Sequence, residues 1–230
     1  MKILAIDTST DTGSIAISDG EDILAESILN VGRTHSETLI PSFQEMLEKT
    51  RLDIKDLDLL ALTLGPGSFT GVRIGASTVK GFALALNKPV AGVSTLEALA
   101  SNFPFSSLPI MPLFDARRGE IYSAMFTWEG GMVKRVSEDR AASPEDVISK
   151  IGTKTIFAGE GLVKYGQMIK GRLGDNAVFA PRAAWYVRAS NVAALGLKSY
   201  KADGGLDIAT FTPSYRRKSE AEIQMVKGLL

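Results

Sequence analysis

The chain has 230 residues, of which 45% are apolar, and 26 basic residues balance 26 acidic ones. This length and apolar fraction fit one large domain or two small ones, each with a core of its own. The balanced charge excludes an overall field that would attract nucleic acid or an anionic membrane. The absence of cysteine excludes disulfides, thiolate metal sites and thiol nucleophiles.

The opening residues do not have the pattern of a targeting signal. They reach Asp7 after four apolar residues, which is shorter than the core of a signal peptide. No uncharged apolar run approaches the length of a membrane span. We therefore expect a cytoplasmic protein that does not contact a membrane.

The first segment predicts a small sheet followed by a helix. Apolar residues at helical spacing predict the helix over residues 34–50, where Thr34 and Glu37 are placed for a capping box. Short turns separate the strands before this helix, which predicts an antiparallel meander over residues 2–8, 14–18 and 23–29.

The next segment alternates strands and helices. Residues 57–64 are apolar almost throughout, as in a strand whose sheet is covered by helices on both faces. After a glycine-rich stretch, we expect a helix from Gly71 to about Leu86, a strand over 88–93 and a short helix over 94–102. The order of elements is βββαβαβα.

The same order recurs in the second half, which implies an α/β fold made by duplication. The boundary is expected near a proline and polar residues, giving domains 1–104 and 105–230, and a last helix after Thr212 is expected to pack back on the first half. The expected elements of the second half are strands at 108–115, 120–128 and 132–138, a helix opened by Ser143 and Pro144, a strand at 154–160, a helix at 162–173, a strand at 176–180 and a helix at 188–202.

In such a duplicated fold a nucleotide would occupy the cleft between the halves. Asp7 and Asp115 end the first strand of each half, where an acid can hold a metal or a water molecule. The turn after Asp7 offers hydroxyls and amides from Thr8 and Ser9 to a phosphate, whereas the turn after Asp115 offers two arginines and one glycine. Asp7 can equally cap its own turn through backbone amides. Both interpretations stay open, and these four residues are the nucleotide-binding candidates.

Residues 63–75, TLGPGSFTGVRIG, are compatible with two roles. They can form a loop that binds phosphate, or a turn that lets a strand and a helix pack closely. They connect a strand to a helix, where backbone amides favour an anion. They lack the Gly-Lys-Ser/Thr end of a phosphate loop, however, and the first lysine after them is Lys80. We favour packing, because Gly71 and Gly75 are four residues apart and let the helix approach a neighbour closely.

Residues suited to catalysis are scarce. His35, the single histidine, lies at an expected helix start and has no second histidine for a metal, so we expect it to face solvent or to cap the helix. Arg216, Arg217 and Lys218 are followed by acidic residues, as on a solvated helix face.

Five stretches together resemble the TsaB family, also known as YeaZ, and the first four cover most of residues 1–100. The stretches are MKILAIDTSTDTGSIAI, THSETLIPSFQEML, TLGPGSFTGVRIGASTVKGFALAL, PVAGVSTLEALA and PSYRRKSEAE. The resemblance implies the duplicated fold of actin, Hsp70 and sugar kinases. It also implies a role in making threonylcarbamoyladenosine beside the anticodon of tRNAs that read codons beginning with adenine. In that family the protein is the partner of its catalytic paralogue TsaD, which transfers the threonylcarbamoyl group, and of the ATPase TsaE.

The resemblance also implies that this chain does not catalyse the transfer. The two metal histidines of TsaD fall on Thr95 and Leu99, and a hydroxyl and an isobutyl group cannot replace two imidazoles on a metal. The implied role is a non-catalytic scaffold that binds no metal and no cofactor by itself and meets tRNA only through the complex. Binding of ATP or ADP in the complex stays open.

The resemblance places the TsaD contact on the helix that starts at Gly71 and on the helix from Ser36 to about Lys49. Small residues there would give a flat surface on which another helix can lie. The same surface would pair two copies of the chain when TsaD is absent. The candidate contact residues are Leu39, Phe43, Gly71, Val72, Gly75, Ala76 and Val79.

Two alternatives from other functional classes remain. A small ATPase or sugar kinase of the same fold would need tight nucleotide binding that depends on Asp7. A metallopeptidase would need a metal site, and the missing histidine pair argues against one.

Overall fold

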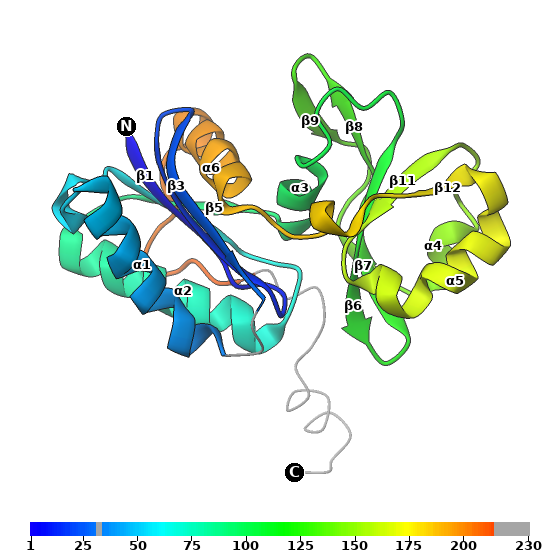
Figure 1. Ribbon diagram of the computed structural model, residues 1–230, viewed down its shortest axis with the longest axis horizontal. Coiled ribbons are helices and arrows are strands. Elements are labelled where there is room, and N and C mark those ends of the chain that lie inside the picture. Colours follow the sequence, from blue (N-terminus) through cyan, green and yellow to red (C-terminus); the bar gives the residue numbers. More distant parts are fainter. Residues whose placement is uncertain (31–33, 214–230) are drawn as a thin grey trace, which may run out of the picture.

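The computed structural model describes residues 1–30 and 34–213, which form two twisted sheets with helices packed on them (Figure 1). The first half contains β1 (Lys2–Asp7), β2 (Gly13–Asp19), β3 (Asp22–Leu29), α1 (His35–Thr50), the 3-10 turn η1 (Ile54–Asp56), β4 (Leu59–Thr63), α2 (Phe69–Leu86), β5 (Val90–Val93) and α3 (Thr95–Ala100). The second part contains β6 (Ile110–Arg117), β7 (Glu120–Ser123), β8 (Phe126–Glu129), β9 (Met132–Arg135), β10 (Arg140–Ala142), α4 (Pro144–Ile148), β11 (Thr155–Ala158), α5 (Gly161–Leu173), η2 (Gly174–Asn176), β12 (Ala177–Phe179), η3 (Arg182–Ala184) and α6 (Ala189–Asp203).

The first sheet has the strand order β3-β2-β1-β4-β5, with β1 to β3 antiparallel and β4 and β5 parallel to β1. Side chains of β1 alternate between its two faces. Leu4 and Ile6 pack with residues of α1 and α2, whereas Ile3 and Ala5 pack with residues of α6. Helices therefore cover both faces of this sheet (Figure 1), as the apolar strand at β4 predicted.

The predicted capping box of α1 is confirmed. The Thr34 side chain accepts from the Glu37 backbone, and the Glu37 carboxylate accepts from the Thr34 amide at 3.1 Å. The helix after the glycine stretch begins earlier than predicted, at Phe69, because the Ser68 hydroxyl caps it by accepting from the Gly71 amide.

The second sheet repeats the first in the strand order β10-β7-β6-β11-β12, but it carries an inserted hairpin. The strand predicted over 120–128 is wrong, because β7 ends at Ser123 and β8 begins at Phe126. Between them the Met125 amide donates to the Ser137 hydroxyl, and the Met125 carbonyl accepts from Val136. β8 instead pairs with β6 at Ile110 and with β9, and the neighbour of β7 is β10, a strand that the sequence did not predict.

The last described helix, α6, was expected in the second half but packs on the first sheet (Figure 1). Its inner face is made of small and branched apolar side chains, and Gly196 lies directly over the Ala61 side chain. Only a face this small can approach the alanines of β1, β4 and β5 so closely. The division at residues 104 and 105 stays a prediction, and the tail helix predicted after Thr212, with its Arg216–Lys218 cluster, lies beyond the described residues.

An ion pair between residues far apart in the sequence fixes the start of α6 on β3. The Glu26 carboxylate accepts from the Arg188 guanidinium and from the Ser190 amide and hydroxyl, at 2.9 and 2.6 Å for Ser190. Burial by itself would raise the pKa of Glu26, but the hydrogen bonds from Arg188 and Ser190 outweigh it and hold the pKa below its ordinary value. None of the described helices has the length and apolar character needed to cross a bilayer.

We predict that Glu26→Gln lowers the free energy of unfolding by about 1–2 kcal/mol at neutral pH, because neutral hydrogen bonds replace charge-assisted ones. A carboxylate with a depressed pKa stabilises the fold above its unfolded pKa and loses that contribution as the pH falls through its folded pKa. The difference between the two proteins, measured by urea unfolding, should therefore shrink as the solution is acidified. Glu45→Gln, which removes an exposed pair with Lys49, is the matched control and should cost no more than about 0.5 kcal/mol. If both variants lower the free energy of unfolding equally, or if the loss in Glu26→Gln does not vary with pH, the charge of Glu26 does not stabilise the contact between α6 and β3.

Candidate functional site

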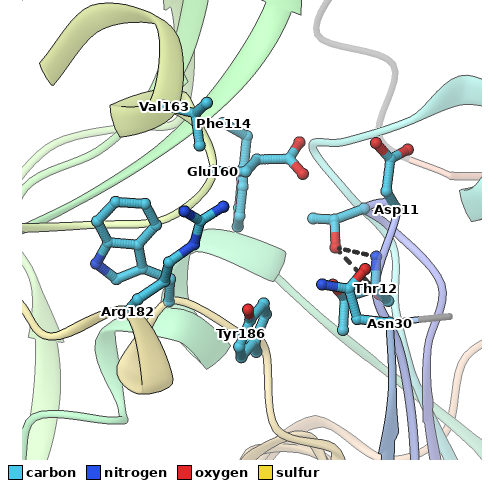
Figure 2. A pocket seen from close by; sticks show the side chains of 10 residues that line it. Asp11, Thr12, Asn30, Phe114, Glu160, Val163, Arg182 and Tyr186 are labelled. Atoms are coloured by element: carbon cyan, nitrogen blue, oxygen red, sulfur yellow. Dashed lines mark hydrogen bonds between the residues drawn. The ribbon is translucent and has the colours of Figure 1, made fainter. Parts of the chain in front are cut away.

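A cavity of about 190 Å³ lies between the two halves (Figure 2). The β1–β2 turn and the end of β3 form one wall, and β6, α5 and the segment around η3 form the other. The lining residues are Thr10, Asp11, Thr12, Asn30, Phe114, Glu160, Val163, Arg182, Trp185 and Tyr186. This is the cleft in which the sequence predicted a nucleotide, but neither Asp7 nor Asp115 is among the residues that line it.

Asp7 lies beneath the β1–β2 turn and is 1% exposed. Its Oδ1 accepts from the Ser9 amide at 3.2 Å, the Ser9 hydroxyl at 2.6 Å and the Thr63 hydroxyl at 2.6 Å. Its Oδ2 has no hydrogen-bond partner within the described ranges. Burial raises the pKa of Asp7, against the opposing effect of the Ser9 and Thr63 hydrogen bonds. The self-capping bond considered from the sequence is therefore present, and a nucleotide role for Asp7, Thr8 and Ser9 stays a prediction.

The glycine block packs directly on this turn. A Cβ on Gly71 would overlap the Thr8 carbonyl oxygen, and one on Gly67 would overlap the Ser9 carbonyl oxygen. The Thr8 hydroxyl donates to the Gly71 carbonyl at 2.8 Å, and the Ser68 amide donates to the Ser9 carbonyl at 2.6 Å. The predicted close approach of the helix is confirmed, but the neighbour is the chain's own turn and not a helix of another protein.

Asp115 lies on the other side of the cleft, near the end of β6. Its Oδ1 accepts from the Arg117 amide at 2.9 Å, and its Oδ2 lies 3.6 Å from the Lys164 Nζ. Asp115 is thus held by residues of its own half. Its nucleotide role also stays a prediction.

The expectation for His35 is wrong. Its Nε2 lies 2.6 Å from the Thr10 carbonyl oxygen, which can only accept, so this nitrogen carries a proton and donates. The ring also lies close enough to Gly13 that a Cβ there would come within 3.0 Å of its Nδ1. The imidazole therefore ties the start of α1 to the β1–β2 turn instead of facing solvent.

Glu160 is a cavity residue that the sequence did not reveal. Burial, followed by the charge of Asp11 and also that of Asp115, raises its pKa to about 7, while Arg117 and the Asp11 backbone hydrogen bond act in the opposite direction. The predicted strand 154–160 ran through this position, but β11 ends at Ala158. Gly159 then turns the chain with a φ of 110°. The glycines on both sides of Glu160 were the available signal for this turn.

Arg182, Trp185 and Tyr186 complete the second wall. The Arg182 guanidinium lies 5.6 Å from the Trp185 ring centroid, and the Trp185 indole nitrogen donates to the Ala180 carbonyl at 2.8 Å. In Figure 2 the Arg182 guanidinium extends toward the side of the cavity that holds Glu160. These residues were missed because they lie in an irregular segment between a predicted strand and a predicted helix.

The positions that the resemblance assigns to metal histidines lie inside the core. Thr95 and Leu99 are both 0% exposed, and the Leu99 side chain packs beside Gly159. Within the described ranges, no group of three or more His, Cys, Asp or Glu side chains is placed to hold a metal ion. Glu97, on the same helix, pairs instead with Arg135 at 3.4 Å.

The residues predicted to contact a partner all face inward. Leu39, Phe43, Val72, Ala76 and Val79 are at most 7% exposed, and Gly71 and Gly75 are also buried. Their side chains pack against the sheet because the apolar stripe of each helix faces the core. Ile40 on α1 and Leu84 on α2 are the large apolar side chains exposed on these two helices, at 40% and 72%.

Comparison with known proteins gives a consistent result. Residues 22–225 match the family described as TsaD, tRNA N6-adenosine threonylcarbamoyltransferase. The tRNA threonylcarbamoyladenosine biosynthesis protein TsaB of Bacillus subtilis is 33% identical over 231 residues, with 99% of each chain covered. A Pseudomonas aeruginosa protein with similarity to the peptidase YeaZ superposes with a TM-score of 0.80 at 26% identity, over 94% of this chain and 99% of that one. Component A of the (R)-2-hydroxyglutaryl-CoA dehydratase of Acidaminococcus fermentans, at a TM-score of 0.50, 12% identity and coverage of 91% and 100%, shares the fold alone. The predicted fold class is thereby confirmed.

We predict that Gly71→Ala destabilises the protein by about 1–3 kcal/mol, because its methyl group forces α2 away from the backbone of Thr8. Gly81→Ala on the same helix is the matched control, since nothing lies within 4 Å of its Cβ position. It should stabilise the protein by up to about 1 kcal/mol through helix propensity alone. Thermal and urea unfolding of both variants measure the difference, and the same sign for both would show that α2 does not depend on this contact.

For Asp7 we predict different results from two substitutions. Asp7→Asn keeps the acceptor for Ser9 and Thr63, so the free energy of unfolding should change little. Asp7→Ala leaves those donors unpaired and should cost about 1–3 kcal/mol. A similar loss in both variants would mean that the carboxylate charge itself is required.

Proposed function

Because the chain belongs to the TsaB family, we propose that it serves in the biosynthesis of threonylcarbamoyladenosine in tRNA as a non-catalytic subunit that binds and activates TsaD together with TsaE. The same proposal places it in the cytoplasm and lets it meet tRNA only through the complex. The chain would then contribute surfaces and shape, while TsaD carries out the transfer.

The observation that carries this proposal is the burial of Thr95 and Leu99. Neither side chain offers the nitrogen or carboxylate ligands of a catalytic metal, and both are enclosed by the core, where Leu99 lies next to Gly159. Coordination at this place would require both new side chains and a cavity. A metallopeptidase activity has no support from these positions.

A nucleotide-driven enzyme of the same fold has weaker support. The backbone of Thr8 and Ser9, which would face phosphates, is covered by Gly67 and Gly71 of the glycine block. The Ser9 amide is already used by Asp7. We therefore assign the chain itself no cofactor and leave ATP or ADP to the assembled complex.

For the partner surface we propose the outward faces of α1 and α2. The rings of Phe43 and Phe82, with centroids 5.2 Å apart, hold the two helices together, so the pair presents a fixed surface. Ile40 and Leu84 are its exposed apolar side chains. In the absence of TsaD the same surface would join two copies of this chain.

The test is reconstituted transfer with TsaD, TsaE, threonylcarbamoyl-adenylate and tRNA. The chain alone should transfer nothing, and its addition to TsaD and TsaE should raise the rate at least about tenfold, which corresponds to about 1.4 kcal/mol of activation free energy. Ile40→Glu and Leu84→Glu should each weaken the binding of TsaD, measured by calorimetry. Val136→Glu, at a 59% exposed position of the second half, is the control and should bind normally. Full transfer without this chain, or transfer by this chain alone, would rule the proposal out.

A further inference from the structure

The cavity between the halves carries opposite charges on different sides of a small space. Asp11 and Glu160 supply carboxyl groups, and Arg182 supplies a guanidinium from a separate segment (Figure 2). We propose that this cavity binds a free α-amino acid, with Arg182 holding its carboxylate and Glu160 and Asp11 holding its ammonium group. This inference goes beyond the proposed function, because it concerns the chain without its partners.

The Arg182 guanidinium is positioned to bind an anion. Stacking on Trp185 limits its motion, and the indole is itself held by the Ala180 carbonyl. Arg182 forms no ion pair with any other residue of the described ranges. A planar guanidinium with free N–H groups binds a carboxylate through two parallel hydrogen bonds.

The opposite side of the cavity favours a cation. The Glu160 carboxyl comes from the N-terminal end of α5 and points toward the β1–β2 turn that carries Asp11 (Figure 2). Asp115 adds a further negative charge near Glu160, but the positive charge of Arg117 has the larger effect on Glu160, so Asp11 is the main negative neighbour. A bound ammonium group would remove the repulsion between Glu160 and Asp11, since each carboxylate would then face an opposite charge.

The size of the cavity selects a small ligand. Its volume is about 190 Å³. That is less than the usual volume of sites for larger ligands, which begin at about 300 Å³. Phe114, Val163 and Trp185 provide apolar surface for a side chain. A nucleoside triphosphate fits poorly, because its negative charges would face Asp11 and Glu160.

Calorimetry of the full chain with the common L-α-amino acids tests the proposal. At least one should bind, and two analogues of that amino acid should each bind at least tenfold more weakly. The amide analogue lacks the carboxylate, and the N-acetyl analogue lacks the ammonium group. This comparison uses the unaltered protein, so it does not depend on the folding of variants.

Variants then locate the site. Arg182→Gln and Glu160→Gln should each weaken binding at least tenfold, while Arg172→Gln, an exposed position outside the cavity, should leave it unchanged. Protonation of Glu160 removes its attraction for an ammonium group, so the affinity should fall as the pH drops below about 7. Glu160→Gln should abolish that pH dependence.

Three results would overturn the proposal. The first is that no amino acid gives heat above that of buffer. The second is binding that survives both cavity substitutions in folded protein, as judged by unchanged thermal unfolding. The third is that ADP or ATP binds in competition with, or in place of, every amino acid in the cavity.

Discussion

The contact between the glycine block and the β1–β2 turn is the constraint on which the first half depends. Gly67 and Gly71 bring the start of α2 against the backbone of Ser9 and Thr8, and the hydrogen bonds of the turn are completed by this helix. His35 binds the same turn from α1. The two helices therefore meet β1 and β2 at one loop of five residues, 8–12, whose conformation sets the first wall of the cavity. A loop held this firmly by its own chain has little backbone left to offer a phosphate.

Local signals in the sequence predicted most of the first half. The capping box of Thr34 and Glu37 and the uninterrupted apolar run of β4 both depend on residues close in sequence, and both are confirmed. The placement of α6 was not predictable in the same way. A helical pattern shows which face of a helix is apolar, but it does not show which sheet receives that face, and both sheets were available. The break between β7 and β8 was missed for a related reason, because strand residues look alike whether one strand continues or a second one begins.

The cavity was harder to predict than the fold. Asp7 and Asp115 are candidates because each follows a strand, but in the structure both form their hydrogen bonds within their own halves. Glu160 matters because burial and the charge of Asp11 act on it, and both depend on the approach of segments far apart in sequence. Arg182 and Trp185 are ordinary surface residues in the sequence and become a stacked pair only when η3 forms. The partner residues show the same limit, since small and apolar side chains on a helix predict a contact surface but not whether that surface faces a partner or, as here, the core.

The return of α6 to the first sheet has a consequence for how the protein is made. The face of β1 that carries Ile3 and Ala5 is covered by a helix that ends at Asp203, so it stays open while most of the chain is still being synthesised. Many proteins complete an N-terminal domain on the ribosome before the next one emerges. Here the N-terminal sheet must wait for nearly the whole polypeptide, and until then its apolar strands are exposed to chaperones and to other nascent chains. The sheet that is synthesised first therefore cannot complete its packing first, because it needs α6.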